Sequence, residues 1–412
     1  MCKNFSKRKW RCAMRTMRDT ENARILASTT TRLLKEGLDE RGRYAGGKWG
    51  GLYLRAPDIY FRILEKAGDK LVRLSEVAEV RRGFTTGAND FFYLKVLPHR
   101  PICPLCGKVH EKALTQEEEA TYWAKGERPP EKALVAVRNG LGWEGYLEAA
   151  VLRPVFKSPK EAPALTVDVG NLNRVFLPAS GDYQTLPLHA RNYVDYGEQV
   201  PVVVARGRSR GQTLVGIPSL STVQGRRPWW WLGEWPEAQV ILPMFERARK
   251  YAFWNPHHAA IDNALYLVLP RYEIDVLRLL IALNSSLFAL FKELLARPPE
   301  GGGGGPLQIK VYQYEEMPIP DPKLLSPPTQ KPLEDFLARP IRNFWEEVGL
   351  TPPGFAGLPA PLPDRKALDD LVFDTLGLSE EERQEVYREA AQLVWERIAK
   401  ARGDLEEEGG TG

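Results

Sequence analysis

The segment EIDVLRLLIALNSSLFALFKELLA (residues 273–296) is a long helix candidate in a chain of 412 residues. Its apolar residues cover much more than one stripe of a helix, and such a helix is usually buried on several sides. The most apolar run, 277–290, is interrupted by Asn-Ser-Ser at 284–286 and is too short to cross a bilayer. The segment therefore predicts a long buried helix and no membrane span.

Short segments bounded by Gly, Pro or Asn and rich in β-branched or aromatic residues predict strands elsewhere in the chain. The strand candidates are FFYLKVL (91–97), VFLP (175–178), VPVVVAR (200–206), QVILPMF (239–245) and ALYLVLP (264–270).

Helix signals lie on both sides of these strands. A helix is predicted at 57–67, with Pro57 at its first position and Gly68 past its end, and a short helical turn capped by Ser75 follows it. At the end of the chain one helix is predicted from Asp364 to Gly377. A second begins with a capping box, Ser379-x-x-Glu382, and ends near residue 401. We expect an α+β fold with a mixed sheet, a buried long helix and a C-terminal helical tail.

The charge of the chain is unevenly distributed, although its net charge is only +4. Residues 1–18 carry seven Lys or Arg and no acid, whereas residues 363–412 carry seven bases and fourteen acids. A basic front favours an anionic partner because of electrostatic steering, and a solvated basic tail explains the first segment equally well.

The four cysteines argue against a disulfide scaffold in so long a chain. The basic leader is not followed by the apolar stretch of a secretory signal. We therefore expect a cytoplasmic protein.

Residues 199–233 contain no acid and give the strongest signal for a nucleic-acid partner. The charged side chains of this segment are Arg206, Arg208, Arg210, Arg226 and Arg227. Arginines on glycine-containing loops can neutralise phosphates or form bidentate bonds with guanine. The first three alternate after a strand, which places them on one side of the chain and favours nucleic acid for them. Trp229, Trp230 and Trp231 can stack on bases, but large aromatics are mostly packing residues, and we favour packing.

The segment RRGFTTGANDFF (81–92) contains two glycines that permit turns with positive φ, in which backbone amides bind anions. Its candidate contacts with phosphates or bases are Arg82, Gly83, Thr85, Thr86, Gly87 and Asn89. On composition alone, a plain turn that leads into a strand, with Asn89 and Asp90 as caps, explains the segment better.

A zinc knuckle is indicated by His99-x3-Cys103-Pro-Leu-Cys106-Gly-Lys-x-His110. Two thiolates in such a turn reach one zinc ion. The sequence contains no second CxxC pair, so the candidate ligands are His99, Cys103, Cys106 and His110. A knuckle that has lost its partners is the alternative. The role of a zinc ion would be structural, because no neighbouring carboxylate indicates an activated water.

The run PPEGGGGGPLQIK (298–310) is not a nucleotide-binding loop, since it lacks Gly-Lys-Ser/Thr. Lys310 is a candidate phosphate contact, and a simple linker is the more economical interpretation. The sequence also lacks a nucleophile elbow, a His-Glu-x-x-His motif and Asn/Asp-Pro-Pro-aromatic, and no glycine-rich loop follows an early strand. We find no catalytic constellation.

Several segments in the expected order resemble the C-terminal half of large N-6 adenine-specific DNA methyltransferases of bacterial and archaeal restriction-modification and phage-defence systems. These segments are GGKWGGLYLRAPDIYFRIL (46–64), EVRRGFTTGANDFFYL (79–94), LIALNSSLFALF (280–291) and GGGGGPLQIKVYQYEEMPIPDP (301–322). The closing helices are similar to that family's tail. The resemblance covers residues 44–325 and 363–402.

The resemblance implies a target-recognition domain that binds double-stranded DNA through the 82–92 loop, the 206–210 segment and the 301–310 segment. In that family an upstream domain carries the S-adenosylmethionine and catalytic motifs, which are missing here. We therefore expect S-adenosylmethionine only on a missing domain or a separate catalytic subunit. This chain alone is expected to be inactive and to hold no catalytic cofactor, with a structural zinc ion as the one candidate ion.

The expected organisation is a basic leader (1–43), a target-recognition domain (44–325) with an insertion (98–150), a proline-rich linker (326–362), a two-helix tail (363–402) and a disordered end (403–412). The sequence thus predicts sequence-specific DNA recognition for an adenine-N6 methyltransferase. The alternatives are a specificity subunit of a multi-subunit restriction enzyme, a divergent methyltransferase or nuclease with unrecognised motifs, and a decayed gene fragment.

Overall fold

The computed structural model describes residues 38, 42, 56–204, 210–296 and 305–409, with side chains up to residue 401. The chain divides into two units, residues 1–66 and 67–412. Helix α4 (Asp58–Ala67) makes up most of what is described of the first unit, with Asp58 in its first turn and Lys66 in its last, as the helix dipole favours. The helix predicted at 57–67 is confirmed. The basic leader lies almost wholly outside the described residues.

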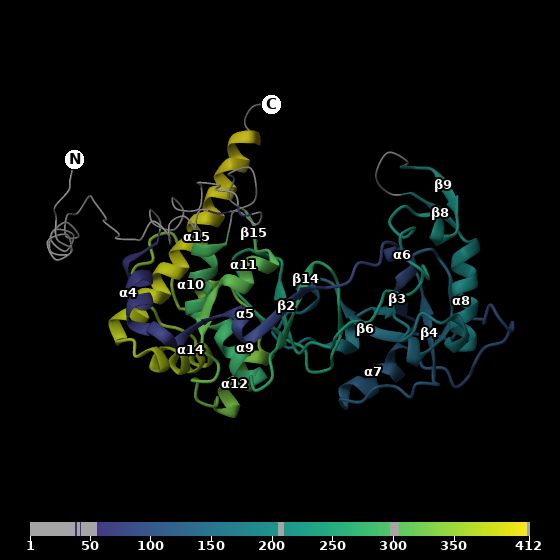
Figure 1. Cartoon of the computed structure of the whole chain (residues 1–412), viewed down its shortest axis with the longest axis horizontal. Helices are drawn as coiled ribbons and strands as arrows, with labels where there is room; N and C mark the ends of the chain where they lie inside the picture. The colour runs from purple at the N-terminus through teal and green to yellow at the C-terminus, as the bar shows by residue number, and fades with distance from the viewer. Residues whose placement is uncertain (1–37, 39–41, 43–55, 205–209, 297–304, 410–412) are drawn as a thin grey trace. The chain divides into compact units, whose positions relative to one another are not determined.

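The larger sheet of the second unit has six strands in the order β13-β6-β7-β3-β4-β5. Figure 1 labels three of them, β3, β4 and β6. Neighbouring strands are antiparallel except β6 and β13, which are parallel, so the sheet is mixed and the fold is α+β. The strands are β3 (Tyr93–Val96), β4 (Leu134–Arg138), β5 (Glu144–Glu148), β6 (Leu152–Phe156), β7 (Arg174–Phe176) and β13 (Ala260–Ile261).

The hydrophobic core beside this sheet includes helix α8 (Leu188–Gln199) and the tryptophan segment. Phe91 stacks on Tyr193 of α8 with ring centroids 4.4 Å apart and contacts the Trp229 ring at 5.1 Å. Trp229 and Trp230 are buried, and Trp231 packs against the same core. The preference for packing over base stacking at these tryptophans is confirmed.

The segment 98–150, expected as an insertion, supplies β4 and β5 to the six-stranded sheet and contains α7 (Gln116–Ala124). Glu119 of α7 accepts two hydrogen bonds of 2.9 Å from the Arg174 guanidinium on β7, and both side chains are buried. This bidentate pair fixes α7 to the sheet, because a charge buried without its partner is very unfavourable. The segment is therefore an integral part of the sheet.

A second sheet has four antiparallel strands in the order β12-β10-β14-β2. Its strands are β2 (Ala78–Arg82), β10 (Val240–Pro243), β12 (Phe253–Trp254) and β14 (Leu265–Pro270). The remaining strands form three antiparallel pairs: β1 (Leu71–Arg73) with β16 (Pro318–Pro320), β8 (Pro201–Val203) with β9 (Thr213–Val215), and β11 (Phe245–Glu246) with β15 (Leu307–Gln308). The predicted strands are confirmed with shorter bounds.

The prediction of one long helix at 273–296 is wrong, although its burial is confirmed. Two helices, α9 (Val276–Asn284) and α10 (Ser286–Leu295), meet at Ser285, which is extended at φ −64° and ψ 150°. The Ser285 hydroxyl oxygen accepts the Phe288 amide at 3.1 Å and so caps α10. Asp369 accepts the Ser286 amide at 2.7 Å and its hydroxyl at 2.6 Å. A distant carboxylate thus satisfies the amide that the break exposes.

The segment 326–362, expected as a linker, contains α12 (Gln330–Ala338) and α13 (Phe344–Glu347) and buries Phe336 and Trp345. Of the tail helices, α14 is Pro363–Leu376 and α15 is Glu380–Gly409. The predicted capping box is confirmed, because Ser379 and Glu382 exchange bonds of 2.7 and 3.3 Å between side chains and amides. Helix α15 continues past residue 401, where an end was predicted.

The remaining helices are short. Ser75 lies inside α5 rather than capping it, since the N-cap is Arg73. The α-helices not yet given are α5 (Leu74–Val77), α6 (Asn89–Phe92) and α11 (Val311–Glu316), and the 3-10 turns are η1 (Gly68–Lys70), η2 (Ala149–Val151), η3 (Pro159–Glu161), η4 (Val169–Asn171), η5 (Tyr183–Thr185) and η6 (Ile217–Ser219). Within the described residues, no helix is long and apolar enough to cross a membrane.

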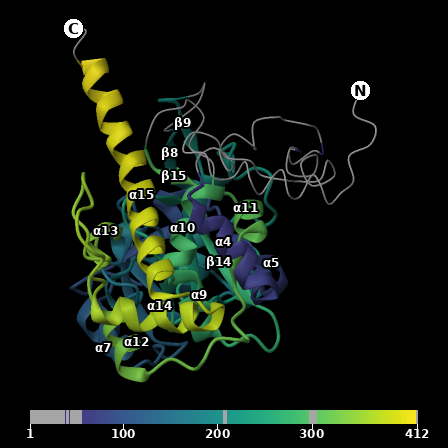
Figure 2. The same cartoon turned by 90° about the vertical axis from the view of Figure 1, so that its left-hand side faces the viewer.

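A buried charge network joins β11, α10 and α15, and Figure 2 shows the two helices side by side. Glu246 on β11 accepts hydrogen bonds from Lys292 at 2.5 Å and from Lys250 at 3.0 Å. Glu293 contacts Lys250 at 2.5 Å and accepts two bonds from Arg397 of α15, at 2.9 and 2.8 Å. Burial alone raises the pKa of the Glu293 carboxyl, but Lys250 and Arg397 outweigh it and lower that pKa to about 2. The network therefore favours ionised carboxylates in the folded state.

We expect the free energy of unfolding to fall with pH between about 4.5 and 2, because the unfolded chain takes up protons there before folded Glu293 does. The variant Glu293→Gln should lose about 3–5 kcal/mol at neutral pH by leaving Lys250 and Arg397 underpaired. Its unfolding free energy should also change less steeply in acid. Urea titrations at several pH values test both expectations. The exposed Glu334→Gln should match the wild type, and an unchanged acid slope in Glu293→Gln would contradict the assignment.

Candidate nucleic-acid interface

The predicted 82–92 loop connects β2 of the four-stranded sheet to α6 and β3 of the six-stranded sheet. The Gly83 amide donates to the Leu265 carbonyl at 3.0 Å, and a Cβ at Gly83 would lie 2.2 Å from the Asp262 carbonyl oxygen. Phe84 is buried, and its amide donates to the Ile261 carbonyl at 3.0 Å. The start of the loop is therefore held against residues 261–265, at a distance that only glycine allows.

A second loop is tied to the first through backbone carbonyls. The Arg226 guanidinium donates through Nη2 to the Thr85 carbonyl at 3.0 Å, and the Thr222 hydroxyl donates to the Gly87 carbonyl at 2.6 Å. Asn263 donates through Nδ2 to the Thr85 hydroxyl at 2.8 Å. Residues 82–89, 222–227 and 262–263 thus meet in one place, which we call the three-loop site.

Thr86 and Asn89 shape the first loop from inside. Thr86 is buried, and its hydroxyl donates to the Asn89 side-chain oxygen and accepts the Ala88 amide at 3.2 Å. Gly87 adopts φ 75°, where side chains are strained. Asn89 and Thr85 are exposed. Of these residues, Thr85 and Asn89 can therefore meet a ligand with least rearrangement.

Arg226 has a structural place in the site. Besides its bond to the first loop, it donates through Nη1 to the Trp229 carbonyl at 3.2 Å, and its guanidinium lies 5.6 Å from the centre of the Phe92 ring. Partial burial lowers the pKa of Arg226 below its ordinary value. Arg226 thus links the two loops through its hydrogen bonds to the Thr85 and Trp229 carbonyls, and we call this link the Arg226 strap.

Arg82 and Arg227 are the exposed cations of the three-loop site. Arg82 donates through Nε to the Asn263 carbonyl at 2.8 Å, and Arg227 donates through Nη1 to two carbonyls at 3.0 Å, those of Gln224 and Arg226. Among the described residues, neither guanidinium forms an ion pair. Both are held by neutral carbonyls and keep their full charge available to an anion.

Asp262 is the carboxylate of this site, and it is already engaged. It accepts the Tyr93 hydroxyl and, at 2.9 Å, the Ala264 amide. Burial and the hydrogen bond to Asp262 raise the pKa of Tyr93 well above its ordinary value, so this donor stays protonated. Asp262 therefore helps to hold the 262–264 turn.

The other predicted DNA contacts lie on different elements. Arg210 is exposed beside Gly211 in the connection between β8 and β9, and Lys310 is exposed at the N-cap of α11. Arg206, Arg208 and the glycines at 301–304 lie outside the described residues. Of the predicted basic contacts, the structure thus brings Arg82, Arg226 and Arg227 together. Thr222 and Asn263 carried no sequence signal, because each is a single polar residue in a turn.

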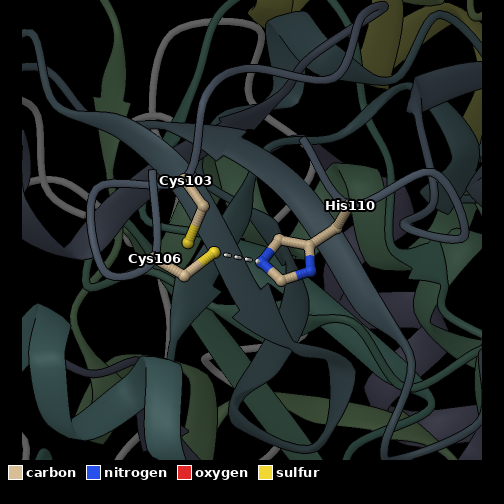
Figure 3. A group of neighbouring side chains, drawn as sticks. All are labelled: Cys103, Cys106 and His110. Carbon is tan, nitrogen blue, oxygen red and sulfur yellow. Dashed lines mark hydrogen bonds between the residues drawn. The ribbon is translucent and has the colours of Figure 1, made fainter. Parts of the chain in front are cut away.

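The predicted knuckle brings together Cys103, Cys106 and His110, whose ligand atoms all lie within 4.8 Å of one another. Cys106 Sγ lies 3.5 Å from His110 Nε2, and Figure 3 shows both thiols on the same side of the imidazole ring. Burial raises the pKa of the Cys103 thiol. His99 is not part of this group, because its ring is exposed and its Nε2 lies 3.8 Å from Glu144. Three of the four predicted ligands therefore converge.

No protein-family model matches the sequence, and no curated protein shows significant similarity to it. Among solved structures, the chain is similar to the type IIG restriction endonuclease BpuSI, with a TM-score of 0.47 and 14% identity over 84% of this chain and 33% of that chain. It is also similar to the type IIL restriction-modification enzyme MmeI, solved in complex with DNA, with a TM-score of 0.34 and 12% identity over 80% of this chain and 36% of that chain. The chain thus spans about one third of either protein.

We expect Gly87→Ala to open the three-loop site, because the new Cβ would lie 2.5 Å from the Thr222 carbonyl oxygen at a backbone φ of 75°. Gly142 is a matched control, since it has φ 87° and nothing within 4 Å of an added Cβ. Gly142→Ala should cost about 1–2 kcal/mol of backbone strain. Gly87→Ala should cost about 1–3 kcal/mol more, from overpacking. Equal losses in urea unfolding would show that the two loops are not held together as described.

Proposed function

We propose that this chain recognises double-stranded DNA as the target-recognition part of an adenine-N6 DNA methyltransferase of a restriction-modification system. The observation that carries the proposal is the Arg226 strap, which joins two loops that present exposed Arg82 and Arg227. Within the part of the chain that the structure describes, neither of these two cations has a carboxylate partner. The resemblance of the sequence to that family supplies the link to adenine methylation.

The chemistry of the three-loop site suits a DNA backbone. The free N–H groups of Arg82 and Arg227 can each bind a phosphate, and such contacts set position and register without reading sequence. Thr85 and Asn89 offer short hydrogen-bonding side chains from the same loop, the kind of group that contacts base edges. The loop backbone is already fixed by its carbonyl and amide contacts, so little ordering entropy opposes binding.

In this proposal the chain described here does not carry out the methyl transfer itself. A partner polypeptide or domain would bind S-adenosylmethionine and receive the target adenine flipped from the duplex. The chain described here would place that partner on the correct sequence.

We expect the purified chain to bind duplex DNA with an affinity that falls steeply with salt. Removing two phosphate contacts in the double variant Arg82→Ala/Arg227→Ala should make the slope of log K against log salt shallower by about 1.8, at about 0.9 per phosphate. Affinity should fall about tenfold for each lost charge-assisted contact. Fluorescence anisotropy across a salt series measures both. Lys331→Ala is the control, since Lys331 is 77% exposed and pairs with Asp335. An unchanged slope in the double variant would remove the three-loop site from the DNA interface.

We expect no methyl transfer and no S-adenosylmethionine binding by the chain alone. Calorimetry with S-adenosylmethionine, and a transfer assay with duplex DNA, check these two expectations. Binding of the methyl donor would instead favour the alternative of a divergent methyltransferase.

A further inference from the structure

We propose that His189, and not His99, completes a four-ligand zinc site with Cys103, Cys106 and His110. Structural zinc is almost always bound by four ligands in tetrahedral geometry, and Cys2His2 is one of its common ligand sets. The three converging residues described above leave one position to fill. The chain has five histidines, of which His189 packs directly against His110.

The centres of the two imidazole rings are already as far apart as those of two histidines bound to one zinc ion. The ring centroids of His110 and His189 are 5.2 Å apart, and the rings are inclined at 81°. With Zn–N bonds of about 2.0–2.1 Å and a tetrahedral angle, two imidazoles on one zinc ion have centres about 5 Å apart. The separation of the two ring centres therefore suits one tetrahedral ion.

Glu148 orients His189 in the way typical of zinc-bound histidines. The His189 Nδ1 lies 3.0 Å from Glu148 Oε1, which fixes Nδ1 as the donor and leaves the Nε2 lone pair for a metal. The same carboxylate accepts the amides of His189 and Ala190 at 3.0 and 3.1 Å, in the first turn of α8. The histidine is thus mostly buried and held from both its ring and its backbone.

His99 has none of these features. Its side chain is 59% exposed, against 13% for His189. Its nearest charged partner is Glu144 at 3.8 Å. The His189 ring nitrogens lie outside the 4.8 Å group of the other three ligands, so the ring must approach the thiolates when the ion binds. That approach requires a turn of the His189 side chain, whereas His99 is exposed and lies 3.8 Å from Glu144.

Such a site would fasten α8 to the knuckle. Helix α8 leads through Val200 into β8, and the β8–β9 hairpin carries Arg210. A zinc ion bound here would therefore fix the base of the arginine-containing hairpin to the six-stranded sheet. The proposal does not depend on the proposed function, because metal binding is measured without DNA.

The experiment uses the full chain stripped of metal by a chelator and titrated with Zn²⁺, or with Co²⁺ as a spectroscopic probe. We expect one equivalent of zinc, an increase in Tm on zinc addition, and the intense visible bands of tetrahedral cobalt with thiolate ligands. His189→Ala should lose the increase in Tm and the tetrahedral spectrum. Glu148→Gln should weaken metal affinity about 10- to 100-fold. His99→Ala is the matched control and should behave as the wild type.

The Tm of each variant without metal separates a folding defect from a lost ligand. A His189→Ala chain with the Tm of the metal-free wild type, but no response to zinc, supports the proposal. Unchanged zinc affinity and cobalt spectrum in His189→Ala would overturn it. Loss of both in His99→Ala, or a wild-type chain that binds no zinc, would overturn it as well.

Discussion

The buried carboxylate of Glu246 constrains much of the second unit, because it must be matched by cations that only the correct packing supplies. Two lysines meet it, one of them from α10, and the neighbouring Glu293 connects the cluster to Arg397 of α15. Burial raises the pKa of the Glu246 carboxyl, and the neighbouring lysines lower it. The lysines have the larger effect, since the pKa is lowered despite complete burial. Any slip of α10 or α15 would leave a charge without a partner.

The candidate interface depends on the same framework. Glu246 follows β10 by three residues, β10 pairs with β14, and every residue of β2 pairs with β14. The loop that leaves β2 is then held by residues 261–265, which precede or begin β14. The position of Arg82 is thus set by sheet register, and its guanidinium is held by the Asn263 carbonyl.

Structural features that depend on residues close together in the sequence could be predicted from it. The capping box at Ser379, the helix after Pro57 and the tight turn at Gly87 depend on neighbouring residues, and all were predictable. Gly83 does not adopt the positive φ that the sequence suggested, and it serves instead the close approach to the Asp262 carbonyl. The break at Ser285 depends on Asp369, more than eighty residues away, so an apolar helical pattern concealed it. Strands β4 and β5 were missed because they lie in a charged, proline-containing segment. The Arg226 strap and the approach of His189 to His110 are likewise tertiary contacts without a local pattern.

The second loop holds the first loop through backbone oxygens and not through particular side chains. Arg226 and Thr222 hold the first loop by the carbonyl oxygens of Thr85 and Gly87, which every amino acid possesses. The side chain of Asn89 and, apart from its bond to Asn263, that of Thr85 are therefore not needed for anchoring by the second loop. A lineage could diversify these two positions while Arg226 and Thr222 kept the loop backbone in place, and a change at Asn89 would also remove its bond to the Thr86 hydroxyl.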